Sequence, residues 1–179
     1  MSESGEMCCI VENLHYICKL YCKNELMAGL IGEHKAKTDA KGRINIPSAL
    51  LRQLPEGAVD KMVLKADIYK KCLILYTTEE WNRQIEIIRT KTNSFNPKHA
   101  DFIRGFYRGT AEVKVDTGNR ILIPANLTAY AGINKDVYLF GQDRKIEIWA
   151  KEVYEEHTLS AEEFAELAKD IMGGDLPLL

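Results

Sequence analysis

A twelve-residue segment occurs twice in this chain. The first copy, DAKGRINIPSAL, spans residues 39–50, and the second, DTGNRILIPANL, spans residues 116–127, which lie 77 positions later. Six positions are identical: Asp39/Asp116, Arg43/Arg120, Ile44/Ile121, Ile46/Ile123, Pro47/Pro124 and Leu50/Leu127. Two copies are too few for a solenoid, which needs about three or more repeats to bury a continuous core. The repeat therefore predicts two half-domains that form one core between them.

Each copy of the repeat is followed by the same order of predicted elements. CLILY, residues 72–76, aligns with KIEIW, residues 145–149, at a separation of 73 positions, so the first unit is four residues longer between these points. Each unit predicts a strand, a turn, a strand that ends at proline, a short helical turn, two strands and a helix. The pattern predicts a mixed α+β fold that is mainly β.

The segment between the first two strands of each unit has the residues of a tight turn. Asp39 can accept hydrogen bonds from the backbone N–H groups that follow it, and Gly42 supplies a positive φ without steric cost. The second copy retains the aspartate as Asp116, while Asn119 takes the place of Gly42, and asparagine tolerates the left-handed region. Gly118 is the alternative residue for that angle. We expect these aspartates to form the turns and to orient the arginines that follow.

Three further segments predict helices. Residues 77–80 (TTEE) fit a capping box, and Asn96 with Pro97 fits an N-cap followed by the first helical position. Residues 160–163 fit another capping box. The last helix then has an apolar stripe that we expect to pack on its own core or on a neighbouring subunit: Phe164, Leu167 and Ile171.

Charge is distributed unevenly along the chain. Residues 27–150 have a net charge of +6, whereas residues 151–179 have −6 and residues 1–26 have −2. A basic core is typical of proteins that bind nucleic acid. The strand alternation that buries Ile44 and Ile46 places odd-numbered residues on the opposite face. That face and its counterpart in the second copy collect the basic residues Lys35, Lys37, Lys41 and Arg43, with Lys114 and Arg120.

The composition argues against several classes of protein. No run in the sequence approaches the roughly 18 apolar residues that a membrane span requires. The first 26 residues have no basic region before their broken apolar run, so they are a poor secretion signal and we expect a cytoplasmic setting. We expect these residues either to precede a natural start at Met27 or to form a loosely attached extension.

The sequence also argues against an enzyme. The four histidines are scattered, and no hydrolase, metalloprotease, phosphate-loop or dinucleotide fingerprint is present. We therefore expect no cofactor, no metal and no small-molecule substrate. Zinc binding at the N-terminus is an alternative, but adjacent Cys8 and Cys9 differ from the CxxC spacing of structural zinc sites. The other residues considered for it are His15, Cys18 and Cys22.

These motifs resemble the MraZ family of bacterial transcriptional regulators, which belong with the AbrB-like swapped-hairpin DNA-binding proteins. The shared hallmark is a DxxxR hairpin that occurs twice and is followed by an apolar-x-apolar-Pro strand, as in DAKGRINIP and DTGNRILIP. The resemblance extends over residues 30–155 through LIGEH, DFIRGFYRGTAEV and LTAYAGINKDVYLFGQDRKIEIW. The chain departs from the family at Asn119, where glycine is usual, and at Thr110, where a small residue is typical.

The resemblance implies a pseudo-two-fold β-barrel of swapped-hairpin type with short helices. Two tandem half-domains of the MraZ/AbrB kind, residues 27–92 and 93–157, would build it. The resemblance does not cover the ends of the chain; from the sequence itself we expect residues 1–26 to be an extension, either disordered or a non-native start, and residues 158–179 to be an acidic helical tail.

The resemblance also implies a function. Family members form rings and bind short direct repeats in double-stranded DNA upstream of the division and cell-wall gene cluster, often including their own gene. The motif arginine is the family's DNA-binding residue and corresponds to Arg43 and Arg120, with Lys35, Lys37 and Lys41 expected nearby. We therefore expect a cytoplasmic, nucleoid-associated homo-oligomer that regulates transcription.

Two alternatives remain at this point. Arg43 could form only a structural ion pair with Asp39 across the turn. The whole protein could instead be an antitoxin-like, protein-binding module of the same hairpin superfamily, since the tail is acidic and contains an amphipathic helix. Such antitoxins are usually short single-unit chains, whereas this chain has both halves.

Overall fold

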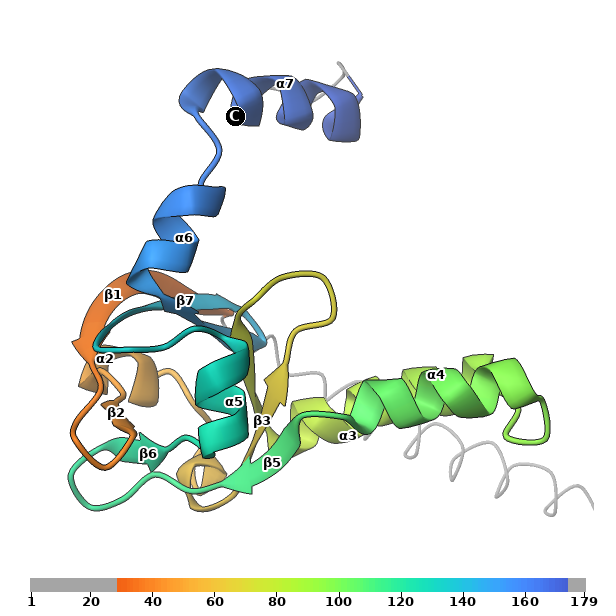
Figure 1. The fold of residues 1–179 in the computed structure, drawn as a ribbon, viewed down its shortest axis with the longest axis horizontal. Helices are drawn as coiled ribbons and strands as arrows, with labels where there is room; N and C mark the ends of the chain where they lie inside the picture. The colour runs from red at the N-terminus through yellow and green to blue at the C-terminus, as the bar shows by residue number, and fades with distance from the viewer. Residues whose placement is uncertain (1–28, 174–179) are drawn as a thin grey trace, which may run out of the picture.

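The computed structural model describes residues 29–173 (Figure 1). The first half contains β1 (Leu30–Lys37), β2 (Arg43–Asn45), α2 (Ser48–Leu51), the short 3₁₀ helix η1 (Ala58–Asp60), β3 (Met62–Ala66), β4 (Leu73–Thr77), α3 (Thr78–Lys91) and α4 (Pro97–Tyr107). The second half contains β5 (Thr110–Val113), β6 (Arg120–Leu122), α5 (Ala125–Tyr130), β7 (Asp136–Asp143), β8 (Lys145–Ala150), α6 (Lys151–His157) and α7 (Ala161–Met172). The predicted order of elements is confirmed in both halves; α4 is grouped here with the first half, whereas the predicted boundary between residues 92 and 93 places it in the second. The predicted extension at residues 1–26 lies outside the described residues.

The strands form two antiparallel sheets. A six-stranded sheet has the order β1-β7-β8-β4-β3-β5, and β2 pairs with β6 in a separate two-stranded ribbon. The counterparts in the two halves are β1 and β5, β3 and β7, and β4 and β8. The strand order read from one edge in the first half's strands is therefore the same as that read from the other edge in the second half's strands. The two halves are therefore related by a pseudo-two-fold axis between β4 and β8. Hydrogen bonding leaves β1 and β5 as edges of this sheet, so closure into a barrel stays a prediction.

The two halves exchange their first strands. All eight residues of β1 pair with β7 of the second half, from Leu30 opposite Asp143 to Lys37 opposite Asp136. In the same way β5 pairs with β3 of the first half. Because each first strand completes the sheet of the other half, neither half contains all the hydrogen-bond partners of its own strands.

One apolar core joins the two halves. Ile44 of β2 and Ile121 of β6 are fully buried, as are Leu50 of α2 and Leu127 of α5. The same cluster includes apolar residues of β3, β4, β7 and β8. The period-two alternation that follows each turn is confirmed, since it places the isoleucines inside and their neighbours outside.

Local capping fixes where the helices begin. Asn96 caps α4 by accepting from the N–H of Lys98, and Ser160 caps α7 in the reciprocal box predicted with Glu163. Thr77 caps α3, but the predicted box is wrong in one respect. The carboxylate of Glu80 does not return to the N-cap: it accepts from Arg83 and Gln84 instead, because those side chains lie one turn further along the helix.

Two helical pairs extend from the sheet. In Figure 1, α3 and α4 run side by side away from the strands, while α6 and α7 leave the sheet in another direction. The apolar stripe of α7 is exposed, so α7 does not pack on the described core. Within residues 29–173, no helix is both long and apolar enough to cross a membrane.

The strand exchange predicts that the halves cannot fold separately. Residues 27–92 lack the partner of β1, and residues 93–179 lack the partner of β5. We expect each fragment to be unfolded or aggregated when it is expressed alone, as measured by circular dichroism and size exclusion. Co-expression of both fragments should restore a soluble complex, and a fragment that melts cooperatively as a monomer would contradict the prediction.

Candidate nucleic-acid interface

The two repeat turns have the same hydrogen-bond geometry. Asp39 Oδ1 accepts from the backbone N–H of Lys41 at 2.8 Å and of Arg43 at 3.0 Å. Asp116 Oδ1 accepts from the N–H groups two and four residues ahead of it, at 2.8 and 3.0 Å. Each aspartate thereby holds its turn closed from within.

The left-handed position of each turn is occupied by Gly42 and Asn119, with φ of 76° and 60°. In the second copy Asn119, rather than Gly118, therefore has the unusual angle. Gly118 lies close to the ion pair of the second copy, since a Cβ there would lie 3.1 Å from Nε of Arg120 and 3.2 Å from Oδ1 of Asp116. The first copy has Lys41 at the equivalent position and forms the same ion pair, so this pair does not require a glycine there.

Each turn aspartate also forms an ion pair with its arginine. Nε and Nη2 of Arg43 each lie 2.7 Å from Oδ2 of Asp39. The equivalent atoms of Arg120 lie 3.0 and 2.9 Å from Oδ2 of Asp116. The two pairs are neighbours, since Nη1 of Arg43 lies 3.9 Å from Oδ2 of Asp116.

This pairing leaves some hydrogen-bond donors of each arginine unused. A guanidinium has five N–H donors, and the intra-turn pair uses only Nε and one N–H of Nη2. The side chains of Arg43 and Arg120 remain 29% and 38% exposed. The structural pair that the sequence left as an alternative is therefore present in both copies, and it leaves donors on each arginine for a ligand.

The turn bonds also shift the pKa values of the aspartates. The backbone N–H of Arg43, together with its guanidinium, lowers the pKa of Asp39 to about 2. The side chain of Arg120 lowers the pKa of Asp116. Both carboxylates are therefore ionised at neutral pH, and the cluster of two arginines and two aspartates has no net charge.

The β2–β6 ribbon brings the two turns together. Arg43 lies opposite Leu122, Ile44 opposite Ile121, and Asn45 opposite Arg120. Since the isoleucines point into the core, the outward face of the ribbon is formed by the other four residues. Leu122 is 57% exposed and Asn45 is also exposed. Sequence reasoning missed these two residues, although the alternation that begins at Arg43 and Arg120 includes them.

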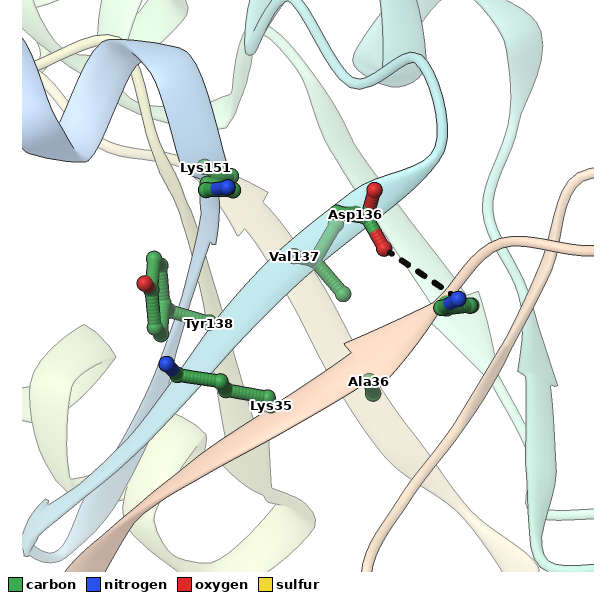
Figure 2. A pocket seen from close by; sticks show the side chains of 7 residues that line it. Lys35, Ala36, Asp136, Val137, Tyr138 and Lys151 are labelled. Atoms are coloured by element: carbon green, nitrogen blue, oxygen red, sulfur yellow. Dashed lines mark ion pairs between the residues drawn. The ribbon is translucent and has the colours of Figure 1, made fainter.

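The predicted lysines are divided between two places. Lys41 lies with Lys114 along a shallow groove beside the ribbon, which Leu122 also lines. Lys35 and Lys37 line a different cavity of about 250 Å³ (Figure 2). They lie there because β1 continues past the ribbon and pairs with β7.

The cavity beside β1 has a mixed lining. Nζ of Lys35 lies 5.3 Å from the centre of the Tyr138 ring, and Nζ of Lys37 lies 3.9 Å from Oδ1 of Asp136. Lys151, the first residue of α6, adds a third ammonium group to the lining (Figure 2). The basic strand face predicted from the sequence is thus present on β1, and part of its charge is offset by Asp136.

No metal centre is formed by the described residues. Within residues 29–173, no group of three or more His, Cys, Asp and Glu side chains could hold a metal ion. Burial raises the pKa of the Cys72 thiol to about 12, so this thiol stays protonated at neutral pH. The residues considered for zinc lie outside the described residues: Cys8, Cys9, His15, Cys18 and Cys22.

The fold and this site define a class of two-repeat hairpin proteins whose halves exchange strands. A family model described as "MraZ protein, putative antitoxin-like" matches residues 30–104 and again residues 106–172. Relatives named Transcriptional regulator MraZ include a protein of Christiangramia forsetii, 44% identical over 151 residues that cover 83% of this chain and 96% of the relative. Others are from Bacteroides fragilis (38% identical; 82% and 92% covered) and Acetivibrio thermocellus (40% identical; 75% and 93% covered). The chain belongs to the MraZ family.

The lowered pKa of Asp39 predicts how the turn responds to acid. The folded value of about 2 lies below the ordinary 3.8, so the ionised carboxylate stabilises the turn above pH 3.8. This stabilisation should be lost as the pH falls through 3.8 towards 2. Carbon-13 NMR of the side-chain carboxyl should follow this titration directly.

Arg43→Ala is the control for this titration. The variant removes the guanidinium but keeps the backbone N–H, which is the largest cause of the shift. The pKa of Asp39 should therefore rise only part of the way to 3.8. An Asp39 that titrates at its ordinary value in the unmodified protein would show that the turn does not form as described.

Proposed function

We propose that this protein is a sequence-specific DNA-binding transcriptional regulator whose β2–β6 ribbon enters the major groove. The single observation that supports this most is the outward face of the ribbon, with two arginines, one asparagine and one leucine on paired strands. The major groove of B-DNA is about 12 Å wide and admits a two-stranded ribbon. The name of the relatives, Transcriptional regulator MraZ, supports the same class of function.

Each outward side chain suits a different base edge. Arg43 and Arg120 can each donate two hydrogen bonds to O6 and N7 of guanine. Asn45 can donate to N7 and accept from N6 of adenine, and Leu122 can contact the methyl group of thymine. Asp39 and Asp116 fix the orientation of the arginines before DNA binds, which lowers the entropy lost on binding.

Phosphate attraction comes from the lysines rather than from the arginine cluster. The two aspartates cancel the charge of the two arginines, so that cluster attracts phosphate weakly. Lys41 and Lys114 flank the ribbon, and Lys35 and Lys37 extend the basic surface along β1. The net charge of +6 over residues 27–150 also favours attraction to the phosphates of DNA.

The two ends of the ribbon differ in one equivalent pair of residues. Asn45 of the first copy corresponds to Leu122 of the second, whereas the arginines are identical. An asymmetric face favours an asymmetric DNA site, so operators would be direct repeats rather than palindromes. Several copies of the chain would then bind successive repeats as a ring, upstream of this protein's own operon in the division and cell-wall gene cluster. Such a protein would act in the cytoplasm at the nucleoid, with the two halves closing a pseudo-symmetric barrel.

Arg43→Ala should abolish specific DNA binding and leave the fold intact. The side chain lies outside the core, and its loss should cost about 1–3 kcal/mol for each engaged copy. Several copies engage at once, so these free-energy costs add and the affinity falls by the product of the individual factors. A mobility shift on the DNA upstream of its own gene, with shuffled DNA as competitor, measures the effect. Arg120→Ala should have the same effect or a smaller one.

Arg89→Ala is the matched control for this test. Arg89 is an exposed arginine on α3 that pairs with Glu86, and it lies outside the ribbon. The Arg89→Ala variant removes the same charge from the protein and should leave the mobility shift of the DNA unchanged. Equal DNA binding by Arg43→Ala and the unmodified protein would exclude the ribbon as the contact surface.

Asn45→Ala and Lys41→Ala should separate base contacts from phosphate contacts. Loss of Asn45 should cost about 1–3 kcal/mol at one base position and leave the salt dependence unchanged. Loss of Lys41 should weaken binding to all sequences and reduce the slope of log K against log salt by about 0.9 for each contact. Binding to single-base operator variants at several salt concentrations measures both effects, and a uniform loss from Asn45→Ala would contradict its assignment.

A further inference from the structure

Helix α7 has an apolar stripe that the described residues leave uncovered. Phe164, Leu167 and Ile171 are 64%, 44% and 73% exposed, and they lie on one face of a helix with caps at both ends. The other faces of α7 are acidic, and residues 161–172 have a net charge of −3. Exposed apolar stripes bordered by polar residues are typical of surfaces that bind another protein.

The internal repeat indicates what kind of surface α7 fits. The family model ends its two matches in α4 and in α7, so α7 is the counterpart of α4. In the first half, Phe106 of α4 stacks on Trp81 of α3, with ring centres 5.5 Å apart. The counterpart of Trp81 is Tyr154 of α6, whose ring instead packs against Phe140 and Tyr138 at 4.7 and 5.2 Å. Helix α4 thus packs on an aromatic ring of α3, whereas the equivalent ring of α6 packs against β7 and not against α7.

An aromatic surface elsewhere on the chain has the matching chemistry. We call it the α3–α4 aromatic face; it consists of Trp81, Phe102, Phe106 and Tyr107. Trp81 and Phe106 are half-buried, whereas Phe102 and Tyr107 beside them are 49% and 45% exposed. This face therefore has both a packed base and an open apolar edge.

Charge favours contact between α7 and this face over contact between two copies of α7. Residues 97–108 have a net charge of +2 from Lys98, Arg104 and Arg108 against Asp101. The ammonium group of buried Lys65 lies 4.5 Å from the centre of the Phe106 ring and adds positive potential behind it. Two copies of α7 would instead bring like charges together.

We propose that α7 of one copy docks on the α3–α4 aromatic face of a second copy of this chain. The proposal deepens the ring of the proposed function, on which it rests, by naming the surfaces that join its subunits. Each chain has one α7 and one such face on separate helical pairs (Figure 1), so the contact is head-to-tail. A head-to-tail contact whose rotation closes gives a ring.

Two full-length variants test the contact from its two sides. Leu167→Glu places a charge in the stripe, and Phe102→Glu places one in the aromatic face; both side chains are exposed enough that neither change opens a core cavity. Light scattering coupled to size exclusion should show a mass many times 20.3 kDa for the unmodified chain and 20.3 kDa for each variant. Lys169→Glu, on the opposite face of α7, is the control and should leave the assembly unchanged.

An equimolar mixture of the two variants gives the decisive result. One variant has an intact α7 and the other an intact aromatic face, so a head-to-tail contact predicts a heterodimer of twice 20.3 kDa. The proposal is overturned if either variant alone still assembles like the unmodified chain. It is equally overturned if the mixture of the two variants stays monomeric. It is also overturned if the unmodified chain is a monomer.

A DNA measurement separates this proposal from the function beneath it. A monomeric Leu167→Glu variant should bind several repeats far more weakly than the ring does and a single repeat about as well as one unmodified subunit. Arg43→Ala should assemble normally but bind neither the repeated DNA sites nor a single site. If the unmodified chain and the ribbon variants assemble normally but the unmodified chain binds no DNA, the DNA-binding function is refuted. The proposed α7 contact is then unaffected.

Discussion

Ile44 and Ile121 lie opposite each other where β2 pairs with β6, and neither side chain is exposed. Their burial fixes the register of the ribbon, because a slip of one residue would turn the isoleucine of the slipped strand outward. The same register sets the arginine of each half on the outer face beside the turn of the other half. The core of the protein and the chemistry of its surface therefore depend on one cross-repeat pair.

Divergence between the repeats has changed the surface while keeping the backbone. The turn is maintained by Gly42 in one copy and by Asn119 in the other, at similar φ. The neighbouring position is Lys41 in the first copy and Gly118 in the second. The first half therefore contributes more charge to the ribbon, and the two halves present different side chains on its outward face.

The sequence predicted what is determined locally. The turns, the alternation after them and the caps of α4 and α7 all depend on residues within four positions of one another. The strand exchange depends on which distant edge β1 meets, and no local pattern specifies that. Glu80 shows the same limit, since its carboxylate suits both a capping box and an ion pair. The nearby guanidiniums of Arg83 and Arg144 decide between them.

Under the proposed function a single ribbon makes few base contacts, and its central charges cancel. High affinity therefore needs several ribbons on one DNA, held at a spacing that matches the repeats. Linked sites act at a high effective concentration, so weak contacts can add up to tight binding only when the subunits are joined. In this chain the residues proposed to contact DNA and the helix proposed to join the subunits lie on different elements. Selection can therefore alter the operator through β2 and β6 without disturbing assembly, and alter assembly through α7 without changing which bases are contacted.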